Sequence, residues 1–156
     1  MNNSLDIRKT IQSEFRQYEE AFAQSLQSDN ALLRQVLDYI HSKRGKQLRP
    51  ILVLLSAALC RGVTEKTIQT AVALELMHTA SLIHDDVVDD SPMRRGGEAV
   101  HALWNNKIAV LVGDYILTRV MAILAELRNV SILNIVSDMG ASLTSGELLQ
   151  LHSGQS

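Results

Sequence analysis

The sequence HTASLIHDDVVDD, residues 78–90, continues an apolar pattern of helical spacing and ends in four aspartates. Ionised carboxylates this close repel one another, which would weaken a helix unless a cation offsets their charge. Side chains four residues apart share a helix face, so Asp85 lies over Asp89 and Asp86 over Asp90. Paired carboxylates supply the oxygen ligands that Mg²⁺ prefers, alongside phosphate oxygens and water. The stretch therefore predicts a helix with a magnesium site near its C-terminal end.

Two arginines follow the aspartates in the segment SPMRRGG, residues 91–97. Guanidinium groups bind phosphate oxygens through paired hydrogen bonds, so Arg94 and Arg95 suit a diphosphate that is already bound to the metal. The plain alternative is a solvated acidic helix end whose charges pair with the basic loop across the surface. Spacing alone leaves both interpretations open.

A second basic segment, KRGKQLRP at residues 43–50, precedes an apolar stretch. Gly45 permits a tight turn, and Lys46 and Arg49 can point at an anion near the N-terminus of the following helix, whose free amides favour negative charge. A basic loop that only improves solubility is the alternative. Together with the aspartates, the segment indicates two diphosphate sites, which a reaction joining two phosphorylated building blocks would need.

The composition favours one globular domain. The chain has 156 residues, 46% of them hydrophobic, and a formal net charge of -2, which argues against a general nucleic-acid-binding protein. The apolar stretch at 51–60 has about half the length of a membrane span, so we interpret it as a buried helix with Cys60 as a small core residue and expect no transmembrane segment. Because the N-terminus lacks the order of a signal peptide, we expect the protein in the cytoplasm.

Helical periodicity dominates the chain and strand-like alternation is nearly absent, so we predict an all-α fold. Pro50 suits the first turn of a helix, and Thr64 can cap the long helix that carries the aspartates. The expected helices span residues 4–28, 30–43, 50–60, 64–89, 97–104, 107–127 and 129–152.

Four side chains of the long helix step by four, three and four and therefore share one stripe: His78, Leu82, Asp85 and Asp89. His78 should face the same cleft as the carboxylates, whereas His84 should point elsewhere. A histidine in this place is either a core residue with its hydrogen bonds satisfied within the protein or a hydrogen-bond donor to phosphate.

Ala80 and Ser81 lie one turn before Asp85, and their small side chains leave space there. The space allows either close helix packing or a hydrophobic tunnel that runs away from the metal site.

Several motifs in this order resemble those of the trans-polyprenyl diphosphate synthase family. The matching segments are GKQLRP at 45–50, DDVVD at 85–89, RRG at 94–96, VGDY at 112–115 and GELLQ at 146–150. The similarity extends over about residues 40–152. It implies an isoprenoid synthase-type helical bundle around a central cavity and a role in isoprenoid biosynthesis.

The resemblance implies a role for each matching residue. Asp85 and Asp89 would bind Mg²⁺ that bridges the allylic diphosphate, with Asp86 in support. Arg94 would contact the same diphosphate, and Gln150 would lie near the reacting allylic group. Isopentenyl diphosphate would be held by the second set of matching residues, namely Gly45, Lys46, Arg49, His78 and Arg95.

The implied prenyltransferase ionises the allylic carbon–oxygen bond, the isopentenyl double bond attacks the carbocation, and a proton is lost. In the family, bulky aromatic residues four or five positions before the first aspartate stop chain growth. Ala80 and Ser81 occupy those positions here. This implies a long all-trans product of about the octaprenyl class, which a phenylalanine at either position should shorten.

Family members are roughly twice as long as this chain, and their second aspartate-rich motif and Lys-Thr pair have no counterpart here. We therefore expect residues 1–156 to form a single domain that corresponds to the N-terminal half of such a synthase, with apolar faces at 64–89 and 107–152 left uncovered. By itself the chain should elongate farnesyl diphosphate negligibly. A homodimer, or a partner that carries the second half, would cover these faces.

Two alternatives to a catalytic prenyltransferase belong to other functional classes. One is a non-catalytic subunit that binds diphosphate or stabilises a partner. The other is a terpene cyclase, which shares the aspartate-rich motif but needs no isopentenyl site, so the presence of Gly45, Lys46 and Arg49 argues against it.

Overall fold

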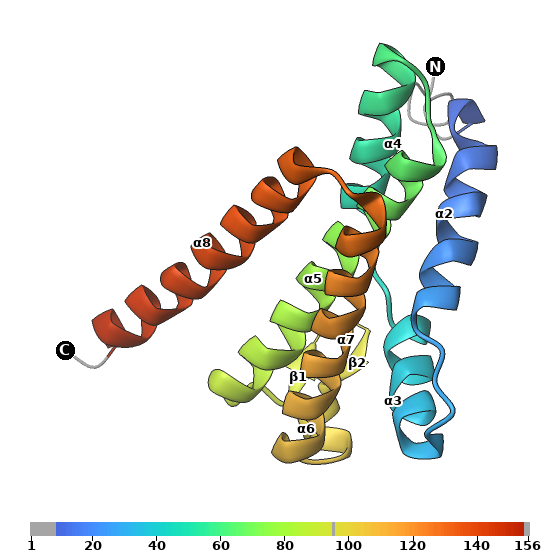
Figure 1. Cartoon of the computed structure of the whole chain (residues 1–156). Coiled ribbons are helices and arrows are strands. Elements are labelled where there is room, and N and C mark those ends of the chain that lie inside the picture. Colours follow the sequence, from blue (N-terminus) through green and yellow to red (C-terminus); the bar gives the residue numbers. More distant parts are fainter. Residues whose placement is uncertain (1–8, 95, 155–156) are drawn as a thin grey trace, which may run out of the picture.

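The computed structural model describes residues 9–94 and 96–154, and this part of the chain is a helical bundle with one very short hairpin (Figure 1). The predicted all-α fold is confirmed. The elements in chain order are α2 (Gln12–Ser25), α3 (Ala31–Ser42), α4 (Leu48–Cys60), α5 (Glu65–Val88), β1 (Met93–Arg94), β2 (Gly97–Glu98), α6 (Val100–Leu103), α7 (Asn106–Leu127) and α8 (Val130–Gly154).

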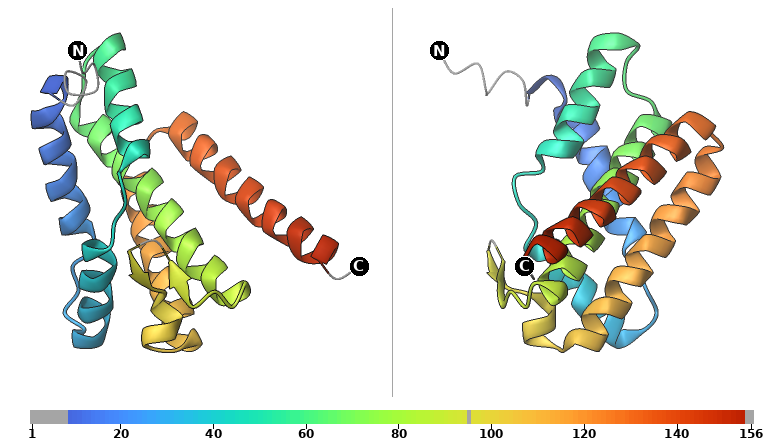
Figure 2. Two further views of the ribbon diagram at one scale, coloured as in Figure 1. Left: turned by 180° about the vertical axis from the view of Figure 1, so that it is seen from behind. Right: turned by 90° about the vertical axis from the view of Figure 1, so that its left-hand side faces the viewer.

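Helix α5 is the centre of the bundle and packs along α7 and against α4 and α2 (Figures 1 and 2). Its buried apolar residues recur every three or four positions, the spacing that puts them on one helix face. This series is Ile68, Val72, Leu76, Ala80 and Ile83, and Ala71 and Ala73 beside it are buried as well. They belong to the same hydrophobic core as the buried face of α7, which runs from Ala109 to Leu127. This core holds the aspartate-bearing end of α5 in place.

Local signals account for where the main helices begin. Thr64 caps α5 in a capping box, because the Thr67 amide donates to the Thr64 hydroxyl oxygen at 3.3 Å and the Thr64 amide donates to Thr67 Oγ1 at 3.2 Å. Pro50 lies in the first turn of α4, as predicted. Asn105 caps α7 by accepting a hydrogen bond from the Ile108 amide at 2.8 Å.

The expected helix at 97–104 is wrong at its beginning. Residues 97–98 form strand β2, which pairs antiparallel with β1 so that Met93 is opposite Glu98 and Arg94 is opposite Gly97. Gly96 has a φ of +88°, a backbone conformation that favours glycine and turns the chain between the two strands. The helix α6 begins after this turn.

Helix α4 is less buried than predicted. Leu52 and Leu59 are 61% and 86% exposed, and Cys60 is exposed as well, so it is not the core residue we expected. The stretch is apolar on all sides, but where α4 packs against α5 and α2 its buried residues are Pro50 and Leu54. Composition does not say which side chains of such a helix a neighbour covers.

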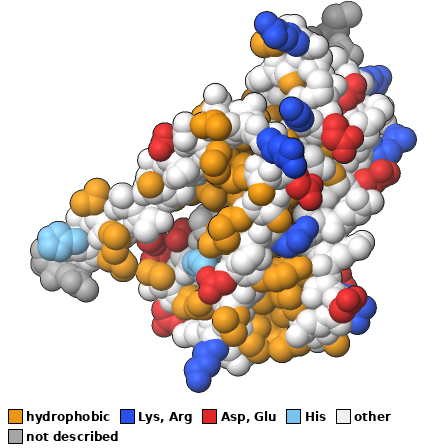
Figure 3. Space-filling model, in the orientation of Figure 1, with side chains coloured by type: hydrophobic (Ala, Val, Ile, Leu, Met, Phe, Trp, Pro, Cys, Tyr) orange, Lys and Arg blue, Asp and Glu red, His pale blue; other side chains and the backbone are white. Residues whose placement is uncertain are grey.

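Helix α8 runs outward from the bundle, and Val136 is its one buried residue among those described (Figure 1). Apolar side chains gather over the face where α7 lies and continue along α8 (Figure 3). Exposed examples are Leu111, Met121, Ile135, Leu148 and Leu149. The expected uncovered apolar surface is therefore present on α7 and α8, whereas α5 buries most of its apolar side chains.

Within the described part of the chain, α7 is the one helix long and apolar enough to cross a membrane by length and composition alone. Core helices of soluble proteins meet the same criterion. In this structure α7 supplies a full face of the hydrophobic core against α5.

Candidate functional site

A basic pocket lies between the start of α4, the C-terminal half of α5 and the hairpin. The residues that line it include Lys43, Arg44, Gly45, Lys46, Arg49, Glu75, His78, Thr79, Leu82, Asp86, Arg94 and Gly97. Its volume is about 590 Å³. The structure thus brings together five residues that the sequence predicted for diphosphate binding: Gly45, Lys46, Arg49, His78 and Arg94. The sixth, Arg95, lies outside the described residues.

Two of the four cations in the 43–49 turn, Lys43 and Arg44, lie over aromatic rings. Arg44 stacks over the Phe22 ring at 4.3 Å, and its Nη1 donates to Gln47 Oε1 at 3.2 Å. This arginine ties the turn to α2. By contrast, Lys46 and Arg49 are exposed and form no hydrogen bond or ion pair with any described residue. These two side chains remain available for an anion.

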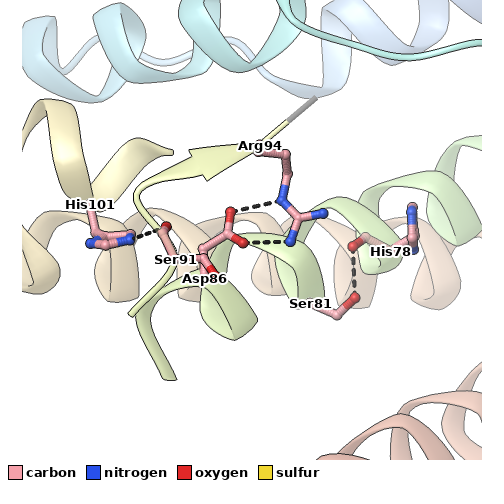
Figure 4. A network of polar contacts seen from close by, with 6 residues as sticks. All are labelled: His78, Ser81, Asp86, Ser91, Arg94 and His101. Carbon is pink, nitrogen blue, oxygen red and sulfur yellow. Dashed lines mark hydrogen bonds and ion pairs between the residues drawn. The ribbon is translucent and has the colours of Figure 1, made fainter. Parts of the chain in front are cut away.

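Asp86 and Arg94 form a bidentate ion pair across the basic pocket (Figure 4). Arg94 Nε donates to Asp86 Oδ2 at 2.8 Å, and Nη2 donates to Oδ1. Asp86 is only 3% exposed, and hydrogen bonding to it raises the pKa of Arg94. For this pair, the alternative in which the acidic helix end pairs with the basic loop is therefore correct. Asp86 orients Arg94 and is not a free ligand for a metal ion.

His78 lies in the basic pocket, on the same side of α5 as Asp86 (Figure 4). Asp85 lines a different hollow, so the expectation that His78 and Asp85 share one cleft is wrong. Their common stripe is instead a ridge between two pockets. Burial, followed by the charges of Arg49 and Arg94, lowers the pKa of His78. Its neutral form is thereby favoured near pH 7.

The second hollow, which we name the apolar pocket, lies between α5, α7 and α8. Its lining comprises Met77, Ser81, His84, Asp85, Val88, Leu117, Gly140, Leu143, Thr144, Glu147, Leu148 and Leu151. Met77 and Gly140 meet at one end, where a Cβ on Gly140 would be 3.5 Å from Met77 Sδ. Asp85 and Glu147 stand toward the other. The pocket therefore leads from carboxylates along an apolar wall.

Ser81 lines this pocket, but Ala80 does not face it. Ala80 is completely buried in the core between α5 and its neighbours, because it shares the face of Leu76 and Ile83. The prediction that both small residues border a tunnel therefore needs correction at Ala80, which serves close packing. Ser81 remains a candidate chain-length residue.

We predict that Ala80→Phe destabilises the fold, whereas Ser81→Phe leaves its stability nearly unchanged. A phenyl ring at Ala80 would overpack the core at a cost of about 1–3 kcal/mol, which lowers the melting temperature by roughly 3–10 °C. A ring at Ser81 would enter the apolar pocket. Thermal melting checks the fold, and calorimetry should show that Ser81→Phe weakens binding of geranylgeranyl diphosphate but not of inorganic pyrophosphate. Equal weakening of both ligands would count against the pocket as a prenyl-chain site.

The sequence analysis did not predict two carboxylates that line the pockets, Glu147 and Glu75. Glu147 of α8 has its pKa raised by burial and then by the negative charges of Asp85 and Asp89. Glu75 is 7% exposed, lines the basic pocket, and has a raised pKa chiefly because of its burial. Glu147 lies inside the GELLQ motif and Glu75 lies three residues before His78, so the motif could have indicated the first and helical spacing the second. Gln150, the predicted member of GELLQ, is exposed on the outward part of α8.

The oxygen donors at the end of the apolar pocket suit a hard cation. Burial and then the charge of Asp89 raise the pKa of Asp85, and the opposing charge of Arg94 offsets only part of this effect. No three His, Cys, Asp or Glu side chains in residues 9–94 and 96–154 are arranged to hold an ion among themselves.

His84 points away from the stripe and toward α7. Its Nε2 lies 3.0 Å from the Val110 carbonyl oxygen and 3.4 Å from Asp114 Oδ1. Gly113 makes room for the ring, because a Cβ at this position would be 2.2 Å from His84 Nε2. The motif VGDY thus contacts the residue immediately before Asp85.

A family model described as polyprenyl synthetase matches residues 30–156 of this chain. The chain belongs to the polyprenyl synthetase family. The resemblance predicted from the motifs is confirmed, and the helical bundle described above is the fold of this family.

Individual polyprenyl synthetases support the same assignment. The octaprenyl diphosphate synthase of Haemophilus influenzae is 38% identical over 146 residues, which are 94% of this chain and 44% of that protein. Heptaprenyl diphosphate synthase component 2 of Geobacillus stearothermophilus is 36% identical over 133 residues, which are 85% of this chain and 42% of that protein. The crystal structure of a decaprenyl diphosphate synthase from Rhodobacter capsulatus has a TM-score of 0.88 at 32% identity and covers 94% of this chain and 46% of its own. The chain spans about half the length of the curated relatives it matches.

Proposed function

We propose that this chain supplies the diphosphate-binding half of a prenyltransferase that condenses an allylic prenyl diphosphate with isopentenyl diphosphate to give a long-chain all-trans polyprenyl diphosphate. The observation that carries the proposal is the pair of pockets on either side of one α5 ridge. One pocket offers Lys46, Arg49 and Arg94, and the other offers carboxylates at the end of an apolar wall. A cytoplasmic location and a homodimer belong to the same proposal and rest on the family resemblance.

Asp85 and Asp89 would hold Mg²⁺ at the carboxylate end of the apolar pocket. The polyprenyl synthase of Caulobacter crescentus was solved in complex with calcium and isoprenyl diphosphate, which supports a divalent cation with such a ligand in this family. When bound, the ion would stabilise negative charge on the departing diphosphate. Asp86 holds the Arg94 guanidinium in the basic pocket, and the charge of Arg94 also acts on Asp85, so it would add to this stabilisation.

The basic pocket would take isopentenyl diphosphate. Lys46 and Arg49 are the free cations there, and the lowered pKa of His78 leaves a neutral imidazole that can donate one hydrogen bond to a phosphate oxygen. The charge of Arg94 acts on His78 in this pocket and on Asp85 in the apolar one, which supports neighbouring sites for the two diphosphates.

A second candidate is a subunit of a two-component synthase. The relative from Geobacillus stearothermophilus is named as component 2 of a heptaprenyl diphosphate synthase. The exposed apolar side chains on α7 and α8 would then contact the other component. Both candidate functions give this chain a diphosphate-binding role. In the second, the remaining site residues come from the other component.

Replacing Lys46 and Arg49 together with alanine should weaken the binding of inorganic pyrophosphate about 10–100-fold in the absence of metal. Hydrogen bonds to charged groups contribute about 1.5–3 kcal/mol each, and exposure of both side chains reduces this value. Isothermal titration calorimetry measures the affinity. Lys66→Ala removes an exposed cation at the start of α5, outside both pockets, and should change nothing. An unchanged affinity of the double variant would reject the basic pocket as a diphosphate site.

A further inference from the structure

The hairpin that carries Arg94 is too small to hold its own shape. Each strand has two residues, and isolated hairpins far longer than this are only marginally stable in water. The Ala99 amide donates to the Pro92 carbonyl oxygen at 2.9 Å and closes the base of the hairpin. The position of Arg94 therefore depends on contacts that the hairpin makes with other elements.

Tyr39 of α3 makes one of these contacts. Its hydroxyl donates to the Glu98 carbonyl oxygen at 2.7 Å, across 59 residues of sequence. A Cβ on Gly97 would be 3.0 Å from the same hydroxyl oxygen, so the backbone of β2 lies directly against it. The hairpin is thereby fastened to α3 on the side opposite its ion pair with α5.

Neighbouring side chains fix the Tyr39 ring in this orientation. Trp104 meets it edge to face, with ring centroids 5.6 Å apart and an interplanar angle of 69°. Lys43 Nζ lies 6.0 Å from the centroid of the same ring. Since Trp104 follows α6 and Lys43 follows α3, the ring joins the hairpin to the basic turn and to the segment that leads into α7.

We propose that Tyr39 is a positioning residue that latches the hairpin over the basic pocket and so keeps Arg94 where a diphosphate can reach it. The inference rests on the proposed function, because it assigns a role in diphosphate binding. Asp86 holds the guanidinium from one wall of the pocket and Tyr39 holds the opposite strand from the other. Without the Tyr39 hydroxyl, the hairpin would be held by the Asp86–Arg94 ion pair and by the contact of His101 Nε2 with the Ser91 carbonyl oxygen, so it would open more often and carry Arg94 with it.

The test is Tyr39→Phe in the full chain, which removes the hydroxyl and keeps the ring. The matched control is Tyr115→Phe, because the Tyr115 hydroxyl also donates to a backbone carbonyl oxygen on a distant element, that of Gln27 at 3.0 Å, but away from both pockets. Hydrogen exchange of the Ala99 amide reports the opening of the hairpin, and titration with inorganic pyrophosphate reports the affinity. Melting temperature and fluorescence of Trp104, the sole tryptophan, report the fold.

Tyr39→Phe should speed hydrogen exchange of the Ala99 amide about threefold to tenfold and weaken pyrophosphate binding by a similar factor. Its melting temperature should be no lower than that of Tyr115→Phe. Exchange equal in the two variants would overturn the latch. Faster exchange with unchanged affinity would overturn the positioning role. Failure of the unsubstituted chain to bind pyrophosphate would reject the proposed function together with the positioning role, while exchange would still decide whether Tyr39 holds the hairpin.

Discussion

Gly113→Ala is expected to lower the free energy of unfolding by about 2–4 kcal/mol. The added Cβ would lie 2.2 Å from His84 Nε2 and 2.5 Å from its Cδ2, so the ring has to move. Overpacking costs about 1–3 kcal/mol, and loss of the contact between His84 and the Val110 carbonyl adds about 0.5–1.5 kcal/mol. In a chain of this size the melting temperature should fall by roughly 5–15 °C.

Gly146→Ala is the matched control, since this glycine is also inside a helix but a Cβ there would meet nothing within 4 Å. It should stabilise the chain by about 0.5–1 kcal/mol, because alanine is the better helix former. In a His84→Ala background, Gly113→Ala should lose most of its cost. If the two substitutions are additive, the clash with His84 is not the cause.

Replacing Asp85 and Asp89 together with asparagine should reduce Mg²⁺-dependent binding of pyrophosphate more than about 100-fold. Changes to groups that only orient metal ligands typically cost 10–100-fold in metal affinity, so loss of two charged ligands should cost more. Calorimetry with and without Mg²⁺ separates this effect from binding in the basic pocket. Asp138→Asn, on an exposed part of α8, is the control. Retention of the Mg²⁺ effect in the double variant would rule out these aspartates as the metal site.

The single substitution Asp85→Asn should also stabilise the metal-free chain at pH 8. Burial, then the charge of Asp89, raises the pKa of Asp85 above its ordinary value of 3.8. Protonated Asp85 therefore does not reduce the stability of the folded chain. As the pH rises through the folded pKa, Asp85 ionises and this part of the stability is lost. The gain in melting temperature should vanish near pH 3, where aspartate is itself neutral. A loss of stability at pH 8 would mean that Asp85 has a favourable partner in the folded chain.

Most of the helices could be predicted because their signals are local. Thr64 caps α5 through atoms only three residues apart, and the predicted range of 64–89 differs from Glu65–Val88 by one residue at each end. The hairpin was missed because two-residue strands have no period to detect. Burial of α4 was overestimated, since an apolar stretch does not say which of its faces a neighbour covers.

The candidate site shows the same division. Spacing placed Lys46 and Arg49 in one turn, and placed His78 and Asp85 on one stripe, because both relations follow from chain geometry alone. Whether a stripe is a cleft or a ridge depends on where α4, α7 and α8 pack, and these helices put His78 and Asp85 in separate pockets.

The sequence by itself determined the helical bundle, its membership of the polyprenyl synthetase family and the residue types for two diphosphates and a hard cation. These follow from helical periodicity, from motifs and from the charge of particular side chains. Only the tertiary structure decided that Asp86 belongs to Arg94, that Ala80 packs in the core while Ser81 borders a pocket, and that Tyr39 fastens the hairpin. Each of these depends on contacts between residues brought together by packing, and such contacts have no periodic signature along the chain.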